Sequence, residues 1–129
     1  MKRKANTSPL PTEAEEQRTV AAWLDWHQIC WFHPANETGT AHGYGLRVRM
    51  KQQGVKPGVP DIVIIDPPNE SRNPYIRGAV IEMKRRKGGV LTDTQNAWIN
   101  AFGSRHWLAA VCNGSDEAIA QLVSWGYGK

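Results

Sequence analysis

Two short apolar segments carry charged residues where a buried strand ordinarily has none. GVPDIVII at residues 58–65 contains Asp61, and GAVIEMKRR at residues 78–86 contains Glu82 and Lys84. Each of these side chains would lose its hydration inside a sheet, which destabilises a fold unless a partner compensates the charge. Their types are those of a hydrolytic site, where carboxylates hold a divalent cation and an ammonium stabilises developing negative charge.

The spacing predicts that these three side chains converge. Glu82 and Lys84 are two residues apart, so in a strand both point to the same face of the sheet. If segments 59–65 and 78–86 pair as a hairpin, Asp61 at the start of one lies beside Glu82 near the end of the other. Two carboxylates and a lysine would then meet at one edge of the sheet.

Neighbouring buried carboxylates repel each other, and a divalent cation is a partner that can hold them. Hard oxygen ligands suit Mg²⁺ or Mn²⁺, at roughly 2.0–2.1 Å for Mg²⁺. We expect Asp61 and Glu82 to bind this cation, with the Met83 carbonyl as a third protein ligand. Lys84 would orient the nucleophile or stabilise charge on the phosphate. A plain ion pair between Glu82 and Lys84 is the alternative, and the preceding GVPD segment favours the metal.

The remaining segments predict the elements that position this group. Thr12 is a good N-cap, with Glu15 three residues on, and the helix it starts would bury Val20, Ala21, Leu24 and one or both of Trp23 and Trp26. The expected order is helix 12–27, strand 29–34, short helix 46–54, strands 59–65 and 78–86, a helix capped by Thr92, strand 107–113, and a helix with Ser115 as N-cap and Gly126 as stop. Trp98 and Trp107 are expected in the core along with Trp23.

This order predicts one α/β domain over residues 12–129, with a small mixed sheet flanked by helices and its two central strands antiparallel. Residues 1–11 are expected to form a flexible basic arm. The net charge of +4 and the pI of about 9.3 favour a polyanionic partner. Cys30 and Cys112 lack CxxC spacing, which argues against a zinc site or a disulfide. With no apolar run of membrane length and no signal peptide, we predict a cytoplasmic protein, bacterial or phage-encoded, without a membrane partner.

Several quoted motifs together resemble a known nuclease signature. GVPD, followed twenty residues later by EMK and then by LTDTQNAW, resembles the PD-(D/E)xK pattern. More narrowly, the chain resembles the virus-type replication-repair nuclease (VRR-NUC) domain, from TEAEEQRTVAAWL through HPANETG to WLAAVCNGSDEAI. The resemblance implies a restriction-endonuclease-like core and metal-dependent hydrolysis of phosphodiester bonds in DNA. It implies that Asp61 and Glu82 are metal ligands, that Lys84 is the catalytic lysine and that Gln95 supports the site.

Two further motifs carry over less directly. The family's glutamate in the first helix best matches Glu13, and Glu16 is the competing choice because it also stands one turn before Val20. The family's PNE element appears here as PANE, with one residue inserted. Asn36 and Glu37 therefore either belong to the site or cap a turn.

Two basic stretches, LRVRMK and KRRK, could form the walls of a cleft that binds the DNA backbone. A solvated charge run is the alternative for any one of these residues. Neither stretch resembles a base-reading module, so we expect recognition of DNA shape rather than sequence. The predicted DNA-binding residues are Arg47, Arg49, Lys51, Arg85, Arg86 and Lys87.

The resemblance also suggests a substrate and an assembly. Stand-alone domains of this family resemble junction resolvases, and a homodimer with two-fold symmetry would present two sites to a four-way DNA junction. We therefore expect a structure-selective endonuclease for branched DNA such as Holliday junctions. A catalytically inactive DNA-binding or scaffolding module on the same fold is the alternative. A sequence-specific restriction-type enzyme ranks lower, because the chain is short for additional recognition elements.

Overall fold

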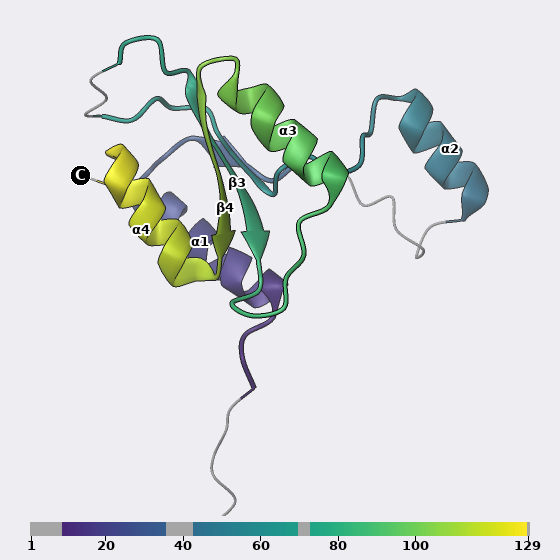
Figure 1. Cartoon of the computed structure of the whole chain (residues 1–129), viewed down its shortest axis with the longest axis horizontal. Helices are drawn as coiled ribbons and strands as arrows, with labels where there is room; N and C mark the ends of the chain where they lie inside the picture. Colours follow the sequence, from purple (N-terminus) through teal and green to yellow (C-terminus); the bar gives the residue numbers. More distant parts are fainter. Residues whose placement is uncertain (1–8, 36–42, 70–72, 129) are drawn as a thin grey trace, which may run out of the picture.

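The computed structural model describes residues 9–35, 43–69 and 73–128, and Figure 1 shows their arrangement. The described part contains the helices α1 (Glu13–Trp26), α2 (Tyr44–Gln52), α3 (Asp93–Gly103) and α4 (Ser115–Trp125) and the strands β1 (Trp31–Phe32), β2 (Ile62–Ile64), β3 (Gly78–Lys84) and β4 (Trp107–Asn113). This is the α/β fold with a small mixed sheet that the sequence predicts. The proposed arm lies mostly outside the described residues, as do Asn36 and Glu37.

The four strands form one sheet in the order β1-β2-β3-β4. Strand β2 is antiparallel to β1 and β3, so the predicted pairing of the two central strands is confirmed. Strands β3 and β4 are parallel, because α3 carries the chain back across the sheet between them. Ile62 lies opposite Ile81, and this pair ends the β2–β3 ladder on the side of Asp61.

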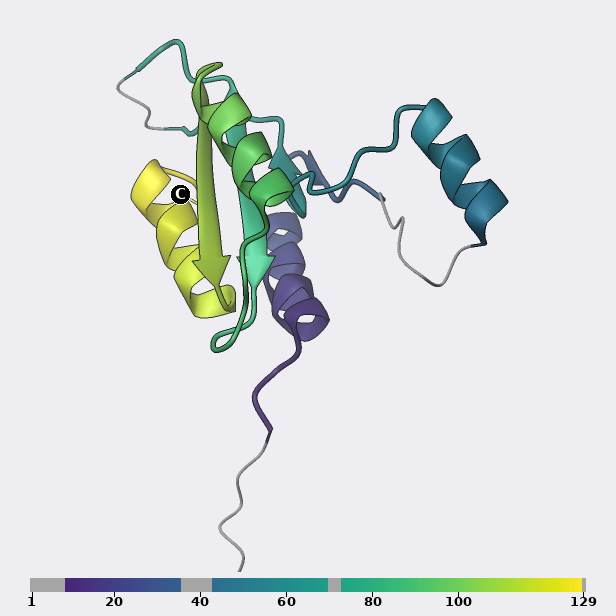
Figure 2. The same cartoon turned by 45° about the vertical axis from the view of Figure 1, so that its right-hand side comes forward.

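The sheet separates two layers of helices (Figures 1 and 2). Helices α1 and α4 pack against one face, and α3 covers the other. Successive side chains of a strand point to opposite faces, so Ile81 and Met83 enter the core beneath α1 and α4, whereas Glu82 and Lys84 face α3. That core contains Val20, Leu24, Ile62, Ile64, Ala79, Ile81, Met83, Cys112, Ala118, Leu122 and Tyr127.

Helix α2 stands apart from this body in both views of the chain (Figures 1 and 2). None of its residues is fully buried, and it carries basic but no acidic side chains. It begins at Tyr44, two residues before the predicted start, and Gly54 follows its end with a φ of 101°.

The strands are shorter than predicted, and one helix cap is different. β1 comprises Trp31–Phe32 rather than 29–34, β2 begins after Asp61, and β3 ends at Lys84 rather than at residue 86. Ser115 is not the N-cap of α4: Gly114 holds that position with a φ of 92°. Ser115 is instead the first residue of α4, and its N–H donates a hydrogen bond to the carboxylate of Glu16 on α1. Gly126 ends α4 in the left-handed conformation, as expected.

The tryptophans divide between the core and the surface. Trp23 packs against the core, but Trp26 is 83% exposed. The prediction that Trp98 and Trp107 belong to the central core was wrong. They are half-buried and contact Phe102, whose ring lies edge-on to Trp107 at 5.3 Å between centroids. These rings form a separate aromatic group between α3 and β4.

The two cysteines are free thiols in different surroundings: Cys30 is exposed and Cys112 is buried. Burial and, to a smaller extent, the charge of Glu117 raise the pKa of Cys112 to about 12. Among the described residues, no helix is long and apolar enough to cross a membrane.

Candidate active site

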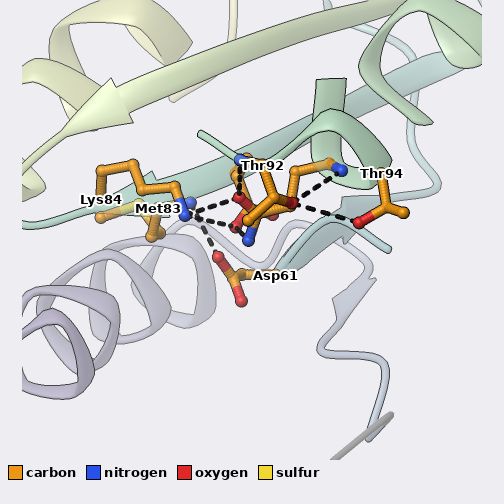
Figure 3. Close-up of polar contacts among 7 residues, drawn as sticks. Asp61, Met83, Lys84, Thr92 and Thr94 are labelled. Carbon is orange, nitrogen blue, oxygen red and sulfur yellow. Dashed lines mark hydrogen bonds and ion pairs between the residues drawn. The ribbon is translucent and has the colours of Figure 1, made fainter. Parts of the chain in front are cut away.

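The end of the β2–β3 ladder brings the two acidic residues together. Asp61 follows Pro60 directly before β2, and the register places it opposite Glu82. The main-chain hydrogen bonds between β2 and β3 do not continue beyond Ile62, and the Asp61 side chain accepts a hydrogen bond from β3 in their place. Its Oδ2 accepts a hydrogen bond from the Met83 N–H at 2.8 Å, as Figure 3 shows. The main chain of β3 therefore fixes the Asp61 carboxylate beside Glu82.

Gln95, at the start of α3, joins the acid and the lysine of β3. Its Nε2 donates to Glu82 Oε1 at 2.9 Å, and its Oε1 accepts from Lys84 Nζ at 2.8 Å. Lys84 Nζ also lies 3.5 Å from Glu82 Oε1. The structure thus brings together Asp61, Glu82 and Lys84, as their spacing predicts, and adds Gln95, which the family resemblance implies.

The first turn of α3 sets the orientation of the Gln95 amide. Thr92 is the N-cap, and its Oγ1 accepts from the Gln95 N–H at 3.2 Å. In return, the Thr92 N–H donates to Gln95 Oε1 at 2.9 Å, which completes a capping box. Thr94 Oγ1 lies 3.1 Å from Thr92 Oγ1 (Figure 3). Because the cap and the lysine share one amide oxygen, the helix start holds Lys84 in place.

The glycine of the GVPD motif has a steric role at this same turn. Gly58 has a φ of 80°, which disfavours any other residue. A Cβ atom at Gly58 would lie 2.8 Å from the main-chain nitrogen of Gln95, much closer than van der Waals contact. Glycine at this position therefore lets the segment before Asp61 pass directly against the start of α3.

One carboxylate oxygen of Glu82 is buried without a hydrogen-bond partner among the described residues. The residue is only 2% exposed, and this oxygen is its Oε2. Burial and, next in size, the negative charge of Asp61 raise the pKa of Glu82 to about 8, against the opposing charge of Lys84. One ammonium does not balance the two carboxylates when both are ionised, and the raised pKa of Glu82 reflects this lack of positive charge.

Glu13 and Asp61 line one pocket beside this group. The pocket has a volume of about 410 Å³, and its other lining residues are Ala14, Gln17, Arg18, Ala21 and His33. Burial raises the pKa of Glu13, Lys84 and Arg85 oppose the shift, and the charge of Asp61 adds to it. The pocket is therefore a continuation of the acidic site towards α1.

Glu16, the alternative to Glu13, is buried elsewhere. Its carboxylate accepts from Arg86 Nε at 3.1 and 3.2 Å, from the Ser115 N–H at 2.7 Å, and pairs with Arg86 Nη2 at 3.1 Å. Burial acts to raise the pKa of Glu16, but these hydrogen bonds and the charge of Arg86 outweigh it and lower the pKa. Glu16 thus connects α1, the end of β3 and the start of α4, and the geometry favours Glu13 for the site.

Replacing Arg86 by methionine is expected to destabilise the protein measurably, because Glu16 would keep a buried charge without its partner. The lowered pKa means that Glu16 favours folding above its ordinary pKa of 4.5, and that this contribution is lost as the pH falls through the folded-state value. The difference from wild type in urea unfolding should therefore shrink at acidic pH. The exposed neighbour Arg85, changed to methionine, is the control. If both variants are equally stable, the structural role of Arg86 is wrong.

The other predicted DNA-binding residues lie in two places. Arg85 and Lys87 are exposed directly after β3, next to the site. Arg47, Arg49 and Lys51 belong to α2, which projects from the segment leading to Asp61 (Figure 1). Arg86 differs from them, because its guanidinium is already paired with Glu16 and with Asp116 at 3.5 Å.

The donor set fits a divalent cation such as Mg²⁺ or Mn²⁺. Asp61 and Glu82 lie side by side, Glu82 has a buried oxygen without a partner in the described ranges, and the two groups carry uncompensated negative charge once Glu82 is ionised. In an extended strand the N–H and C=O of one residue point to the same side. The Met83 carbonyl is thus directed to the Asp61 side, where the ladder has ended. No three His, Cys, Asp or Glu side chains in the described ranges form a metal cluster. Two carboxylates that leave room for water and phosphate are typical of Mg²⁺ sites.

Comparisons with known proteins agree with this geometry. Residues 4–116 match the family model of the VRR-NUC domain. A solved structure described as a VRR_NUC domain protein is similar to this chain, with 21% sequence identity and a TM-score of 0.69. The match covers 92% of this chain and 90% of that chain. No curated protein matches the sequence. At that identity, the structural likeness concerns the fold alone.

Proposed function

The chain belongs to the VRR-NUC family, and from this premise we propose that it is a divalent-metal-dependent endonuclease that hydrolyses phosphodiester bonds in DNA. One observation carries the proposal: Asp61, Glu82 and Lys84 converge although Glu82 keeps a buried oxygen that has no partner in the part of the chain that the structure describes. A folded chain that did not use this group for chemistry would be more stable with apolar residues there. The same argument speaks against an inactive scaffolding module.

In this proposal, Asp61, Glu82 and the Met83 carbonyl hold Mg²⁺ or Mn²⁺, with Glu13 on the wall of the adjoining pocket. When bound, such a cation supplies Lewis-acid stabilisation of the phosphate and a lowered pKa for water. Lys84, fixed by Gln95, orients the attacking water and stabilises the negative charge that develops on the phosphate. Gln95, which is held by the N-terminal cap of α3, fixes the positions of the Glu82 carboxylate and the Lys84 ammonium relative to each other.

The basic residues around the site suit a DNA backbone. We assign phosphate contacts to Arg85 and Lys87 beside β3, and to the three basic residues of α2. Arg86 is left out because Glu16 occupies its guanidinium. These contacts read shape and charge rather than base sequence. We further propose that the protein acts in the cytoplasm as a homodimer on branched DNA such as Holliday junctions, because a two-fold dimer would match the two-fold symmetry of the junction.

A cleavage assay tests these statements separately. Labelled four-way junction, flap and linear duplex are incubated with Mg²⁺, Mn²⁺, Ca²⁺ or EDTA. We expect nicking with Mg²⁺ or Mn²⁺, little with Ca²⁺ or EDTA, and faster cleavage of the junction than of the duplex. Equal cleavage in EDTA would contradict the metal dependence. Equal rates on all three substrates would contradict the structure selectivity, and a monomer in sedimentation at micromolar concentration would contradict the dimer.

A further inference from the structure

His33, the first residue of the HPANETG segment, contacts the acidic site although no role is predicted for it. The β1–β2 ladder ends at the pair Phe32–Val63, and His33 is the next residue of the chain. Its Nδ1 lies 2.7 Å from the main-chain oxygen of Asp61 and 3.1 Å from the side-chain amide of Gln17. His33, Gln17 and Asp61 all line the same pocket. An imidazole thus takes the place of a main-chain donor where the strand pairing stops.

The hydrogen-bond chemistry fixes the roles of these groups. A carbonyl oxygen only accepts, so His33 Nδ1 must carry the hydrogen that it donates to Asp61. A protonated Nδ1 cannot also accept from an amide N–H. The structure places Gln17 Nε2 at 3.1 Å from this nitrogen, but heavy-atom positions do not distinguish the two ends of an amide, and only the orientation with the oxygen towards the ring is compatible with a protonated Nδ1. The Asp61 carbonyl thus selects the tautomer of the imidazole, and the amide of Gln17 lies against the same ring nitrogen.

Asp61 is consequently held from two directions. Its carboxylate Oδ2 is bound by the Met83 N–H, and its main-chain oxygen is bound by His33. Asp61 itself lies outside β2, where the sheet ladder no longer fixes the backbone. The two contacts compensate for that loss and orient the carboxylate towards Glu82.

We infer that His33, oriented by Gln17, is a positioning residue that sets the Asp61 carboxylate for binding a divalent cation. This inference rests on the proposed function, because Asp61 must be a ligand for its orientation to matter. Groups that orient metal ligands typically change metal affinity by 10- to 100-fold. His33 contacts the main-chain oxygen of Asp61 rather than its carboxylate, so we expect a change in metal affinity at the lower end of that range.

Calorimetric titration with Mn²⁺ tests the inference on the protein without DNA. H33A and Q17A should bind Mn²⁺ about tenfold more weakly than wild type. H33N should bind nearly as wild type, because the asparagine Nδ2 can donate from the place of Nδ1, whereas H33Q should be as weak as H33A. Q121A, a matched change on α4, should have no effect. Wild-type affinity in H33A, or rescue by H33Q and not by H33N, would overturn the inference.

A structural measurement separates this inference from the proposed function. If wild type itself fails to bind Mn²⁺, the proposed function is wrong, and crystals grown without metal still decide the role of His33. In wild type and H33N, the Asp61 carboxylate should keep its hydrogen bond to the Met83 N–H. In H33A that bond should be lost or lengthened. An unchanged Asp61 in H33A would overturn the positioning role.

Discussion

Replacing Lys84 by methionine is expected to lower the rate of DNA cleavage by about a thousandfold while DNA binding persists. The ammonium lies within hydrogen-bond reach of Gln95 and 3.5 Å from Glu82, so it is fixed before substrate arrives. Methionine keeps the length of the side chain but loses the charge that stabilises the phosphate. Single-turnover cleavage of a labelled junction with Mg²⁺, together with gel-shift binding in Ca²⁺, separates the two effects.

The same variant has a second expected property. Removing a positive charge beside Glu82 leaves the site more negative, so the methionine variant should bind Mn²⁺ at least as tightly as wild type. K87A is the matched control, because Lys87 is exposed and should affect DNA binding only modestly and leave the cleavage step unchanged. Cleavage at the wild-type rate by the methionine variant would remove Lys84 from the mechanism.

Replacing Glu82 by glutamine is expected to abolish Mn²⁺ binding and to lower cleavage by at least about a hundredfold, because a metal ligand is lost. It should also stabilise the metal-free protein at alkaline pH. The pKa of Glu82 is about 8 in the fold, above its ordinary value of 4.5, so the folded state holds the proton longer than the unfolded chain does. The stability of the metal-free wild type should therefore fall as the pH rises from about 4.5 to 8.

Glutamine has no charge to bury, so E82Q should escape this loss. In EDTA at pH 9, we expect E82Q to melt roughly 4 °C above wild type, which corresponds to about 1 kcal/mol. At pH 5 the difference should disappear. Added Mg²⁺ should raise the melting temperature of wild type but not that of E82Q. The control is E117Q, an exposed change on α4. A wild type whose stability rises from pH 5 to 9 in EDTA would contradict a buried, uncompensated Glu82.

The sequence predicts the main features of the site because they are local or follow from one strand pairing. Alternation along β3 places Glu82 and Lys84 on one face, and the antiparallel register brings Asp61 opposite Glu82. The position of Thr92 as the N-cap of α3 is likewise predicted from the sequence. Family resemblance adds Gln95 and Glu13, which no spacing rule would relate to β3.

The features that the sequence does not predict depend on tertiary contacts. The pairing of Arg86 with Glu16 joins residues seventy positions apart in the sequence. In the sequence Arg86 belongs to a basic stretch and is predicted to bind DNA, but its guanidinium is occupied by this pairing. The same carboxylate shifts the cap of α4 from Ser115 to Gly114. His33 follows a two-residue strand whose pairing with β2 fixes its contact with Asp61, and the HPANETG segment that it opens does not by itself indicate this contact.

Diffraction from crystals grown with Mn²⁺, recorded at a wavelength where manganese scatters anomalously, tests the central claim most directly. We predict one strong anomalous peak between the carboxylates of Asp61 and Glu82, with the Met83 carbonyl among the ligands. The peak should be absent in crystals of E82Q. Two carboxylates that point away from each other with no ion between them, at saturating Mn²⁺, would contradict the account.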